Sequence, residues 1–419
     1  MPDGVLHLSS LAGSPLLDSS GERLGRVDDV VARLDLADPL PPVIGLRAAI
    51  GGRVLFVPAT RVAELEPGAA HISTTKLNLA QFERRPGEVL LRADVLGRSL
   101  INVNTARLVR ASEVELIRED GAWRVAGVDP SLGARVRRLL PRRMRGDAEV
   151  ESGLIPWTEL EPFVGHVPTS RLRLAHRRIA HLHPAQIADL VEAASHEEGE
   201  EILEAVGQDK ELEADVFEEL DDEHQLEFLD ERTDNEIAAV LSRMASDDAA
   251  DLLLEIKQER RRPVLDLLPP AKQRKIKGLL GYNPSTAGGV MSPDFVAVSV
   301  EATVGAAIAA ARAQDVASET LNAVILTDGD GALAGLVTAG QLLCAPPEQS
   351  ISTLAENSPP PVTAEAEIPE VARVMTDYNL VTLPVVDADG RPIGVVSVDD
   401  ILELTLPEDW RRRYGLARE

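Results

Sequence analysis

Apolar residues recur at helical spacing from residue 181 to residue 280, and their clusters return about every twelve residues. Because positions i, i+3 and i+4 share one face of a helix, each cluster predicts one amphipathic helix. The short repeat favours brief helices stacked in series over long ones. Asp or Glu opens most of the units, where a negative charge stabilises a helix N-terminus. The clusters contain Leu190, Leu203, Val216, Leu229, Val240, Leu252, Leu267 and Leu279.

The same stretch concentrates the negative charge of the chain. Residues 181–260 hold 26 Asp and Glu against five Lys and Arg, a net charge of −21, whereas the whole 419-residue chain carries −26. One interpretation is a solvated acidic face on the helical array. The other is a surface that uses its charge to bind cations or basic proteins. Nucleic acid is not predicted as a partner, because phosphates require Lys and Arg.

The first 130 or so residues are expected to be rich in β-strands. The segments around Leu24-Gly25-Arg26 and Leu96-Gly97-Arg98 resemble each other, and each glycine is predicted to turn a hairpin between short strands. Asp120-Gly121 between two apolar runs is a further hairpin signal. These segments resemble a pair of PRC-barrel modules, small β-barrels found in the photosynthetic reaction-centre H subunit and in ribosome-maturation proteins. The resemblance implies modules at 1–80 and 81–145 with a structural role.

Residues 131–180 reverse the sign of the charge, with ten Lys and Arg against five Asp and Glu. We predict a basic linker at 146–180 that is helical and docks on the acidic array. Anionic lipid is an alternative partner for these arginines. Single-stranded nucleic acid is not favoured, because no aromatic side chains are interleaved with them.

A joint is predicted at 281–293, where Asn283-Pro284 and Gly288-Gly289 interrupt helical structure. Beyond it come two copies of a pattern that are offset by 59 residues: apolar strand, Asp-Gly turn, apolar strand, and a hydroxyl residue before a helix. This repeat resembles a tandem pair of CBS domains, a βαββα fold that forms a ligand-binding module. The resemblance places these domains at 294–345 and 346–410, with a tail at 411–419. Equivalent positions are Gly331 and Gly390, Gly335 and Gly394, Thr338 and Ser397, and Gln341 and Asp400.

Residues 183–405 together resemble the cytosolic part of the MgtE magnesium transporter family. Three segments carry the resemblance: His183-Pro-Ala-Gln-Ile-Ala-Asp-Leu190, Asp247-Asp-Ala-Ala-Asp-Leu-Leu253 and Thr286-Ala-Gly-Gly-Val-Met291. The resemblance implies an acidic N domain at 181–280 that faces a dimer of CBS pairs, with Mg²⁺ ions between them that hold the assembly closed. A transmembrane domain follows in that family. Here the sequence ends at Glu419, so we predict sensing without a membrane span.

The candidate metal ligands are carboxylates on both sides of this assembly. Mg²⁺ takes hard oxygen ligands and keeps several waters, so one or two carboxylates suffice for a site. In the helical array the predicted ligands are Asp247, Asp248 and Asp251, which share or adjoin one helix face. In the second CBS domain they are Glu367, Asp377, Asp400 and Glu403. Asn379 stands where members of the family carry an acidic ligand, so one site is expected to be weakened or lost. Simple solvation is the alternative for each carboxylate.

A second ligand is implied by the resemblance to CBS domains. Ser397 and Asp400 match the Ser-x-x-Asp pattern that holds a nucleotide ribose, and Leu383-Pro384 would lie near the base. The first copy has Thr338 and Gln341 instead and lacks the carboxylate, so one nucleotide site per pair is expected. Asp400 cannot serve ribose and metal at once, and the two assignments compete.

Enzyme activity is not predicted, because P-loop, nucleophile-elbow and zincin motifs are absent from the sequence. His181 and His183 form an isolated H-x-H without Cys partners, which does not indicate zinc. The single cysteine, Cys344, excludes a disulfide framework and indicates a reducing cytoplasm. No signal peptide is read at the N-terminus.

The sequence therefore predicts a multidomain α+β protein with β-barrel-like modules, a helical acidic domain and a tandem CBS pair. Its predicted function is that of a soluble cytoplasmic regulator that senses Mg²⁺, with an adenine nucleotide such as ATP as a second candidate ligand, and that forms a homodimer through its CBS domains. One alternative is an accessory subunit of a separate membrane magnesium transporter. Another is a structural interaction protein with a relic sensor.

Overall fold

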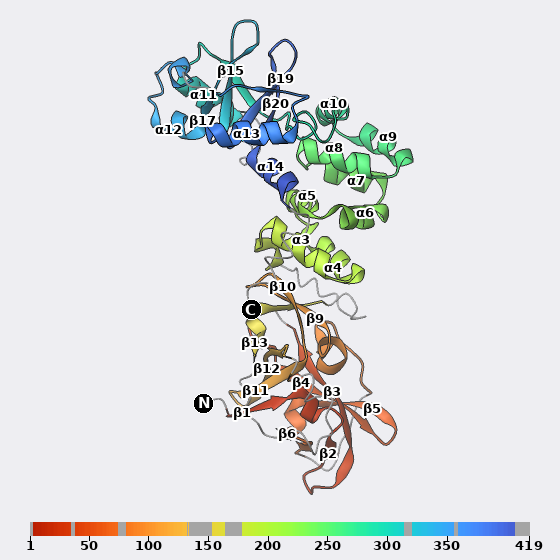
Figure 1. The fold of residues 1–419 in the computed structure, drawn as a ribbon. Coiled ribbons are helices and arrows are strands. Elements are labelled where there is room, and N and C mark those ends of the chain that lie inside the picture. The colour runs from red at the N-terminus through yellow and green to blue at the C-terminus, as the bar shows by residue number, and fades with distance from the viewer. Residues whose placement is uncertain are drawn as a thin grey trace. The chain divides into compact units, whose positions relative to one another are not determined.

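The computed structural model describes residues 3–34, 38–73, 81–131, 133, 153–163, 178–313, 321–355 and 359–406. The chain divides into two compact units, Met1–Asp221 and Asp222–Glu419. The predicted mixture of a sheet-rich N-terminal part, a helical array and two βαββα repeats is confirmed (Figure 1). The domain boundaries stay a prediction. Among the described residues, no helix combines the length and the apolar character that crossing a membrane would need.

The N-terminal part consists of three sheets over one hydrophobic core. The largest sheet contains β2 to β8, with β3 between β2 and β4 and with β8 paired to β3. A second sheet has the order β1-β11-β12-β13, and a third has the order β10-β9-β14. The core contains side chains from Leu6 to Leu160 without a break between the two predicted modules. The elements are β1 (Asp3–His7), α1 (Leu8–Leu11), β2 (Pro15–Leu17), β3 (Arg23–Arg33), β4 (Val43–Ile50), β5 (Arg53–Pro58), η1 (Ala59–Arg61), β6 (Val62–Glu66), β7 (Ala69–Ile72), β8 (Glu88–Leu90), η2 (Leu91–Val95), β9 (Ser99–Asn102), β10 (Arg107–Arg110), β11 (Glu113–Glu119) and β12 (Ala122–Asp129).

Two repeats in this part are offset by 84 residues. The predicted alignment instead pairs the segment around Gly25 with the segment around Gly97. Gly97 corresponds to Gly13, since both adopt left-handed backbone angles (φ 83° and 80°). Gly25 was expected to turn a hairpin, and that prediction was wrong. It lies inside β3, where a Cβ atom would be 2.2 Å from the carbonyl oxygen of Ala49. Gly25 therefore permits the close approach of β4. The hairpin at Asp120-Gly121 is confirmed between β11 and β12.

Each repeat supplies a buried carboxylate that binds the first helical turn of the other. Asp29 accepts hydrogen bonds from the backbone N–H groups of Arg92 (2.8 Å) and Ala93 (3.1 Å) in η2. Glu113, at the equivalent position of the second repeat, accepts one from the backbone N–H of Ser9 (3.0 Å) in α1. Carboxylates satisfy the free N–H groups of a helical turn in this way. The repeats are thus joined by reciprocal caps as well as by their core.

Part of the predicted helical linker is strand instead. Residues 155–162 form β13 (Ile155–Pro156), the turn η4 (Trp157–Glu159) and β14 (Leu160–Pro162). β13 pairs with β12 and β14 with β9, and Trp157 and Leu160 enter the common core. An apolar segment at a sheet edge gains more by pairing than by forming an isolated helix. The arginines predicted to form the basic cluster at 135–145 lie outside the described residues.

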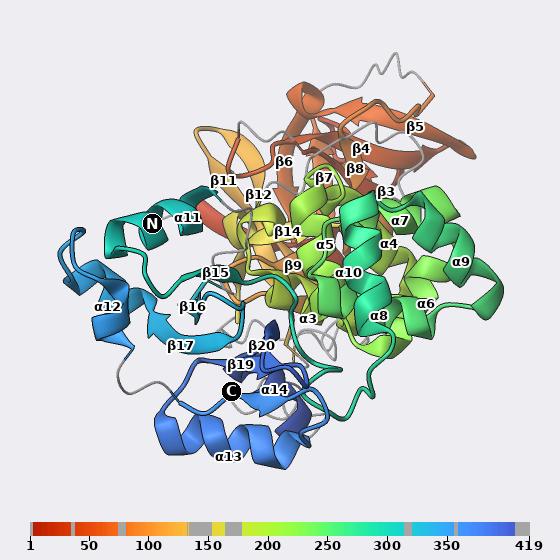
Figure 2. The same cartoon turned by 90° about the horizontal axis from the view of Figure 1, so that it is seen from above.

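The acidic stretch forms short helices, as its apolar period predicts. From α5 onward each helix begins twelve residues after the last, at positions 210, 222, 234, 246, 258 and 270. Within each compact unit a helix packs against the next but one: α3 against α5 in the first, and α6 against α8, α7 against α9 and α8 against α10 in the second (Figure 2). The helices are α3 (Pro184–Ala193), α4 (His196–Val206), α5 (Lys210–Glu219), α6 (Asp222–Asp230), α7 (Asp234–Leu241), α8 (Ser246–Glu255), α9 (Gln258–Leu267) and α10 (Pro270–Leu279).

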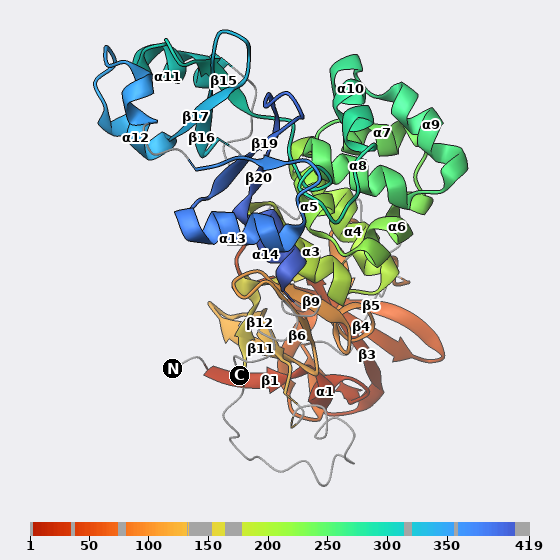
Figure 3. The same ribbon diagram turned by 45° about the horizontal axis from the view of Figure 1, so that its top comes forward.

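The two C-terminal repeats have the predicted βαββα order. Each contains a parallel strand pair and an antiparallel hairpin, and Gly331 and Gly390 occupy equivalent left-handed turn positions (φ 83° and 76°). Figure 3 shows the two repeats as separate groups of strands and helices. The first comprises β15 (Val296–Ser299), α11 (Val304–Ala313), β16 (Ala323–Thr327), β17 (Leu333–Thr338) and α12 (Ala339–Cys344), followed by η6 (Ile351–Leu354). The second comprises β18 (Val362–Thr363), α13 (Ile368–Tyr378), β19 (Thr382–Val386), β20 (Pro392–Ser397) and α14 (Val398–Thr405).

The joint after α10 is packed on the second of these repeats. The backbone N–H groups of Ala287 and Gly288 donate to the carbonyl oxygens of Ala366 and Ala364, each at 2.8 Å. Ser292 then exchanges two backbone hydrogen bonds with Val395 of β20. The joint therefore connects the end of the helical array to the second repeat by a continuous hydrogen-bonded path.

Candidate functional site

The first turn of α8 carries the predicted N-domain carboxylates in different environments. Asp247 is half-buried, and its Oδ1 atom is shielded from solvent and accepts no hydrogen bond from the described residues. Asp248 is exposed. Asp251 lies four residues after Asp247, so the two share one face of α8, while Leu252 and Leu253 are buried in the core. Asp247 and Asp251 thus share one face of α8, and Asp251, like Asp248, is exposed.

Burial and neighbouring charges make the ionised form of Asp247 costly. The pKa of the Asp247 carboxyl is raised to about 6, chiefly by loss of solvent and in smaller part by the negative charge of Asp294, while the hydrogen bond of its own backbone lowers it. The positive charge of Lys272 opposes this rise. The pKa of Asp251 is also raised to about 6. Desolvation is the largest cause, and the negative charges of Glu255 and Asp222 contribute to the rise. An unpaired carboxylate in such a place favours either a proton or a cation.

Asp400 reaches the same centre from the second CBS-like repeat. It is the third residue of α14, and its Oδ2 accepts hydrogen bonds from the backbone N–H (3.2 Å) and the hydroxyl (2.5 Å) of Ser397. The pKa of Asp400 is raised to about 7, chiefly by desolvation and in smaller part by the negative charges of Asp247 and Asp399. Asp247 and Asp400 therefore lie close enough to repel each other, although 153 residues separate them in sequence.

The other predicted ligands occupy different places. Glu367 is exposed at the N-terminus of α13, whereas Asp377 is near its C-terminus and pairs with Arg373 at 3.2 Å. Ten residues of helix span about 15 Å, so these two cannot hold one ion. The side chain of Glu403 lies outside the described residues. Asn379 ends α13 in the left-handed conformation (φ 52°), which Asn adopts more readily than most residues.

Sequence reasoning missed four residues around the first turn of α8: Ser246, Lys272, Lys275 and Asp294. Asp294 accepts hydrogen bonds from the hydroxyl of Ser246 (2.9 Å) and from the ammonium group of Lys275. Lys272 donates to the carbonyl oxygen of Met244, just before α8. These contacts connect α8 and α10 with each other and with the joint. Because the partners lie far apart in sequence, no local pattern reveals them. Two hydrogen bonds that share Asp294 thus connect Ser246 with Lys275.

The predicted nucleotide residues gather at one end of the β19–β20 hairpin. Leu383 and Pro384 are buried in β19, and Ser397 pairs across the hairpin with Thr382. The hydroxyl of Thr382 is buried and has no hydrogen-bond partner among the described residues. In the first repeat, Gln341 occupies the position of Asp400 and donates to the carbonyl oxygen of Leu354 at 3.1 Å. The two copies thus differ in the polar group that each presents.

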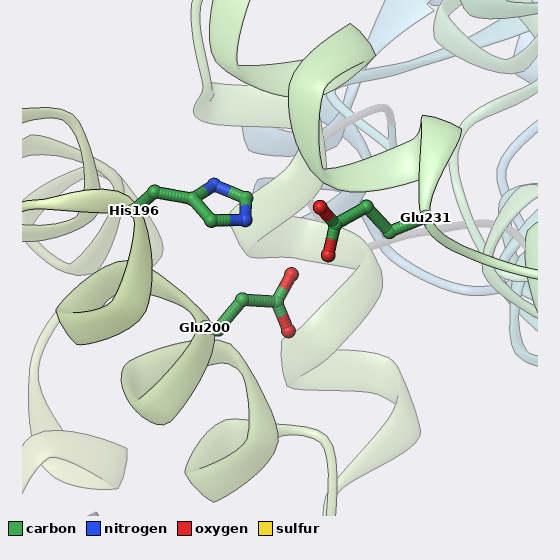
Figure 4. Close-up of side chains that lie close together, drawn as sticks. All are labelled: His196, Glu200 and Glu231. Atoms are coloured by element: carbon green, nitrogen blue, oxygen red, sulfur yellow. The ribbon is translucent and has the colours of Figure 1, made fainter. Parts of the chain in front are cut away.

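A histidine and an acidic residue lie one turn apart on α4. Figure 4 shows the side chains of His196 and Glu200, whose candidate ligand atoms lie within 4.8 Å of each other. Two ligands on one turn are a common feature of helices and do not define a metal site by themselves. Glu231, the third residue in Figure 4, belongs to the other compact unit. His183 caps α3 through its side chain.

Comparisons with known proteins cover the second half of the chain. A family model of the MgtE intracellular N domain matches residues 182–285, and the CBS domain model matches residues 287–348 and 351–406. The magnesium transporter MgtE of Thermus thermophilus is 30% identical over 194 residues, which are 46% of this chain and 43% of that protein. The MgtE of Bacillus subtilis is 25% identical over 194 residues, again 46% of this chain and 43% of that protein. The chain thus spans less than half the length of these curated relatives.

Solved structures give the same picture. The cytosolic domain of the Mg²⁺ channel MgtE in complex with ATP is 28% identical, with a TM-score of 0.50, and the match covers 54% of this chain and 92% of that one. The soluble part of a magnesium transporter, 24% identical with a TM-score of 0.51, shares the fold over 55% of this chain and 90% of its own. Residues 182–406 are therefore an MgtE N domain followed by a pair of CBS domains, homologous to the cytosolic domains of MgtE magnesium transporters.

Proposed function

We propose that this protein is a cytoplasmic regulatory protein that binds Mg²⁺ between the N-domain helix α8 and the CBS-domain helix α14. Two observations carry the proposal: Asp247 is close enough to Asp400 to raise its pKa, and one oxygen of Asp247 is buried without a hydrogen-bond partner among the described residues. Two carboxylates that repel each other in a desolvated place are stabilised by a cation between them. Homology to the cytosolic domains of a magnesium transporter supports Mg²⁺ as that cation.

The donor set fits this ion. Mg²⁺ uses oxygen ligands, keeps several water molecules and needs only one or two carboxylates. Asp247 and Asp400 would each supply one oxygen, and Asp251 would hold a coordinated water or a second ion from the next turn of α8. A unit pair at contact distance near a protein surface is worth about 4 kcal/mol before screening. Mg²⁺ would therefore favour the arrangement in which α8 and α14 are close over arrangements in which they are apart.

The test is the stabilisation that Mg²⁺ confers. For one site, a ligand at a hundredfold excess over its Kd adds about 2.7 kcal/mol to the free energy of unfolding. The melting temperature of the wild-type chain should rise with MgCl₂, whereas that of the double variant Asp247→Asn and Asp400→Asn should start higher and rise little. Asp389→Asn, a matched loss of charge at an exposed turn, should behave as the wild type. Parallel curves for all three proteins would refute the assignment.

An adenine nucleotide is a second candidate ligand of the CBS pair. The unpartnered hydroxyl of Thr382 beside Ser397 favours it, as does the ATP complex of the homologous cytosolic domain. Asp400→Ala should weaken ATP binding measured by calorimetry, and Gln341→Ala should not, because Gln341 is engaged by Leu354. Equal losses would show that the two copies bind alike. Competition between ATP and Mg²⁺ for Asp400 would appear as a change in ATP affinity with MgCl₂.

The partner of such a regulator would be a second copy of the chain through the CBS domains, and a membrane transporter is the alternative. An accessory subunit should co-sediment with membranes that contain its transporter, whereas an independent regulator should remain in the supernatant. The proposed role is that of a binding protein and not of an enzyme, in line with its homology to regulatory domains.

A further inference from the structure

Two lysines of α10 point their charges at the beginning of α8. Lys272 donates a hydrogen bond to the carbonyl oxygen of Met244, two residues before α8 begins. Lys275, one turn later, pairs with Asp294, which in turn accepts the hydroxyl hydrogen bond of Ser246. Ser246 is the first residue of α8 and is fully buried. α10, which packs against α8, therefore brings two ammonium groups to the first turn of that helix.

This arrangement opposes the usual electrostatics of a helix. The N-terminus of a helix has a partial positive charge, and cations are unfavourable there unless anions compensate them. Asp294 compensates Lys275 by direct contact. Lys272 is half-buried, and the carboxylate whose pKa its charge lowers is Asp247. Lys272 therefore combines a hydrogen bond to the segment that precedes α8 with a charge that acts on Asp247 in the first turn of that helix.

We propose that Lys272 is a built-in counter-cation of the acidic centre and that it sets the Mg²⁺ concentration at which the centre is filled. The proposal rests on the function proposed above. In the metal-free protein the ammonium group of Lys272 neutralises part of the charge of Asp247. When Mg²⁺ enters, the two cations repel each other, so the ion binds less tightly than the carboxylates alone would allow. Lys272 therefore raises the threshold of the site towards higher free Mg²⁺.

Removal of this charge has two opposite consequences. Lys272→Met keeps most of the volume of the side chain but removes the ammonium group, so the Kd for Mg²⁺ should fall about tenfold. The same change should lower the stability of the metal-free protein, because Asp247 loses its counter-charge and the carbonyl of Met244 loses a donor. A purely structural lysine would lower stability equally with and without Mg²⁺ and leave the Kd unchanged. Lys272→Arg keeps the charge and should keep a Kd near that of the wild type.

Isothermal titration of the full, chelator-treated chain with MgCl₂ tests the proposal. The variants are Lys272→Met, Lys272→Arg and Lys277→Met. Lys277 is an exposed lysine of the same helix, and its ammonium group donates a hydrogen bond to Gln273. The expected result is a lower Kd for Lys272→Met alone, with a difference that shrinks at high NaCl because salt screens the repulsion.

An unchanged Kd for Lys272→Met, or an equal fall for Lys277→Met, would overturn the role of Lys272 and leave the Mg²⁺ site standing. A wild-type chain that binds no Mg²⁺ would overturn both. If Lys272→Met does not fold, a Kd for Lys272→Arg that departs from the wild type by tenfold would contradict the proposal.

Discussion

The carboxylate of Asp247 on α8 raises the pKa of Asp400 on α14, so two residues of different domains share one electrostatic centre. Both residues are half-buried, and the repulsion between their carboxylates is a cost to the metal-free fold. Binding proteins commonly keep such destabilised groups where a ligand will relieve them. The cost is therefore itself a measurable property of the site.

The first prediction concerns pH. The folded-state pKa values of Asp247 (about 6) and Asp400 (about 7) lie above the ordinary value of 3.8. Between about pH 4 and about pH 7 the folded protein binds more protons than the unfolded chain. The free energy of unfolding should therefore fall as the pH rises through this range. One pKa unit corresponds to about 1.4 kcal/mol, and the combined effect should be a few kcal/mol. Urea unfolding in the presence of a chelator measures it.

A control variant and Mg²⁺ should both weaken this pH dependence of stability. Asp400→Asn cannot ionise, so its stability should change less between pH 5 and pH 8 than that of the wild type. Mg²⁺ binds the ionised carboxylates, so binding should release protons and tighten as pH rises through 6 to 7. A metal-free wild type that becomes more stable on going from pH 5 to pH 8 would contradict the assignment of these pKa values.

The local periodicities of the sequence were sufficient for most of the fold. The twelve-residue return of apolar clusters predicts helices α5 to α10 because each helix buries one face against its neighbours. The 59-residue offset predicts both CBS-like repeats, including the turns at Gly331 and Gly390. Gly25 was misread because a glycine that turns a chain and a glycine that admits a neighbouring strand look alike in sequence.

The candidate site was only partly accessible from sequence. Asp247 and Asp400 were named as separate ligands from the family resemblance. Their proximity depends on the joint, which packs along the segment after β18 and along β20. Ser246, Lys272, Lys275 and Asp294 could not be found from any motif. Their contacts cross between α8, α10 and the joint, at separations of 19 to 48 residues. Such long-range contacts carry no periodic signal.

A second prediction compares two glycines near the joint. A Cβ atom at Gly289 would lie 2.3 Å from the carbonyl oxygen of Asn283, a backbone atom that cannot rotate away. Gly289→Ala should therefore destabilise the protein by about 1–3 kcal/mol. Gly278→Ala, in the last turn of α10, meets no atom within 4 Å and should stabilise it by up to about 1 kcal/mol, because alanine favours helix. Opposite shifts of melting temperature are expected, and shifts of one sign would argue against the close-packed joint.

A third prediction addresses the reciprocal caps of the N-terminal repeats. Asp29→Ala and Glu113→Ala each leave a helical turn without its acceptor, and each should cost about 1–2 kcal/mol. Glu64→Ala, at an exposed position of β6, should change the stability by no more than about 0.5 kcal/mol. Because the core is common to both repeats, either cap variant should shift one unfolding transition of this part rather than split it in two. Calorimetry of the full chain would reveal a split, which would show that the repeats unfold independently.

The last prediction tests whether two copies associate through the CBS domains. Leu343 on α12 and Leu402 on α14 occupy equivalent positions, 59 residues apart, and their exposed fractions are 81% and 50%. We expect a second CBS pair to cover these exposed leucines, because equivalent positions of the two repeats would then be buried in one symmetric interface. Full burial of one leucine side chain is worth about 1.5–3 kcal/mol, and a symmetric dimer would bury four.

The double variant Leu343→Asp and Leu402→Asp should therefore weaken the dimer by at least about a hundredfold and leave the fold intact, since neither side chain enters the core. Val54→Asp, an exposed apolar residue of β5, should leave the mass unchanged. Analytical ultracentrifugation at micromolar concentration decides the matter: a wild-type chain that sediments as a monomer, or a double variant that remains dimeric, would exclude this face as the interface.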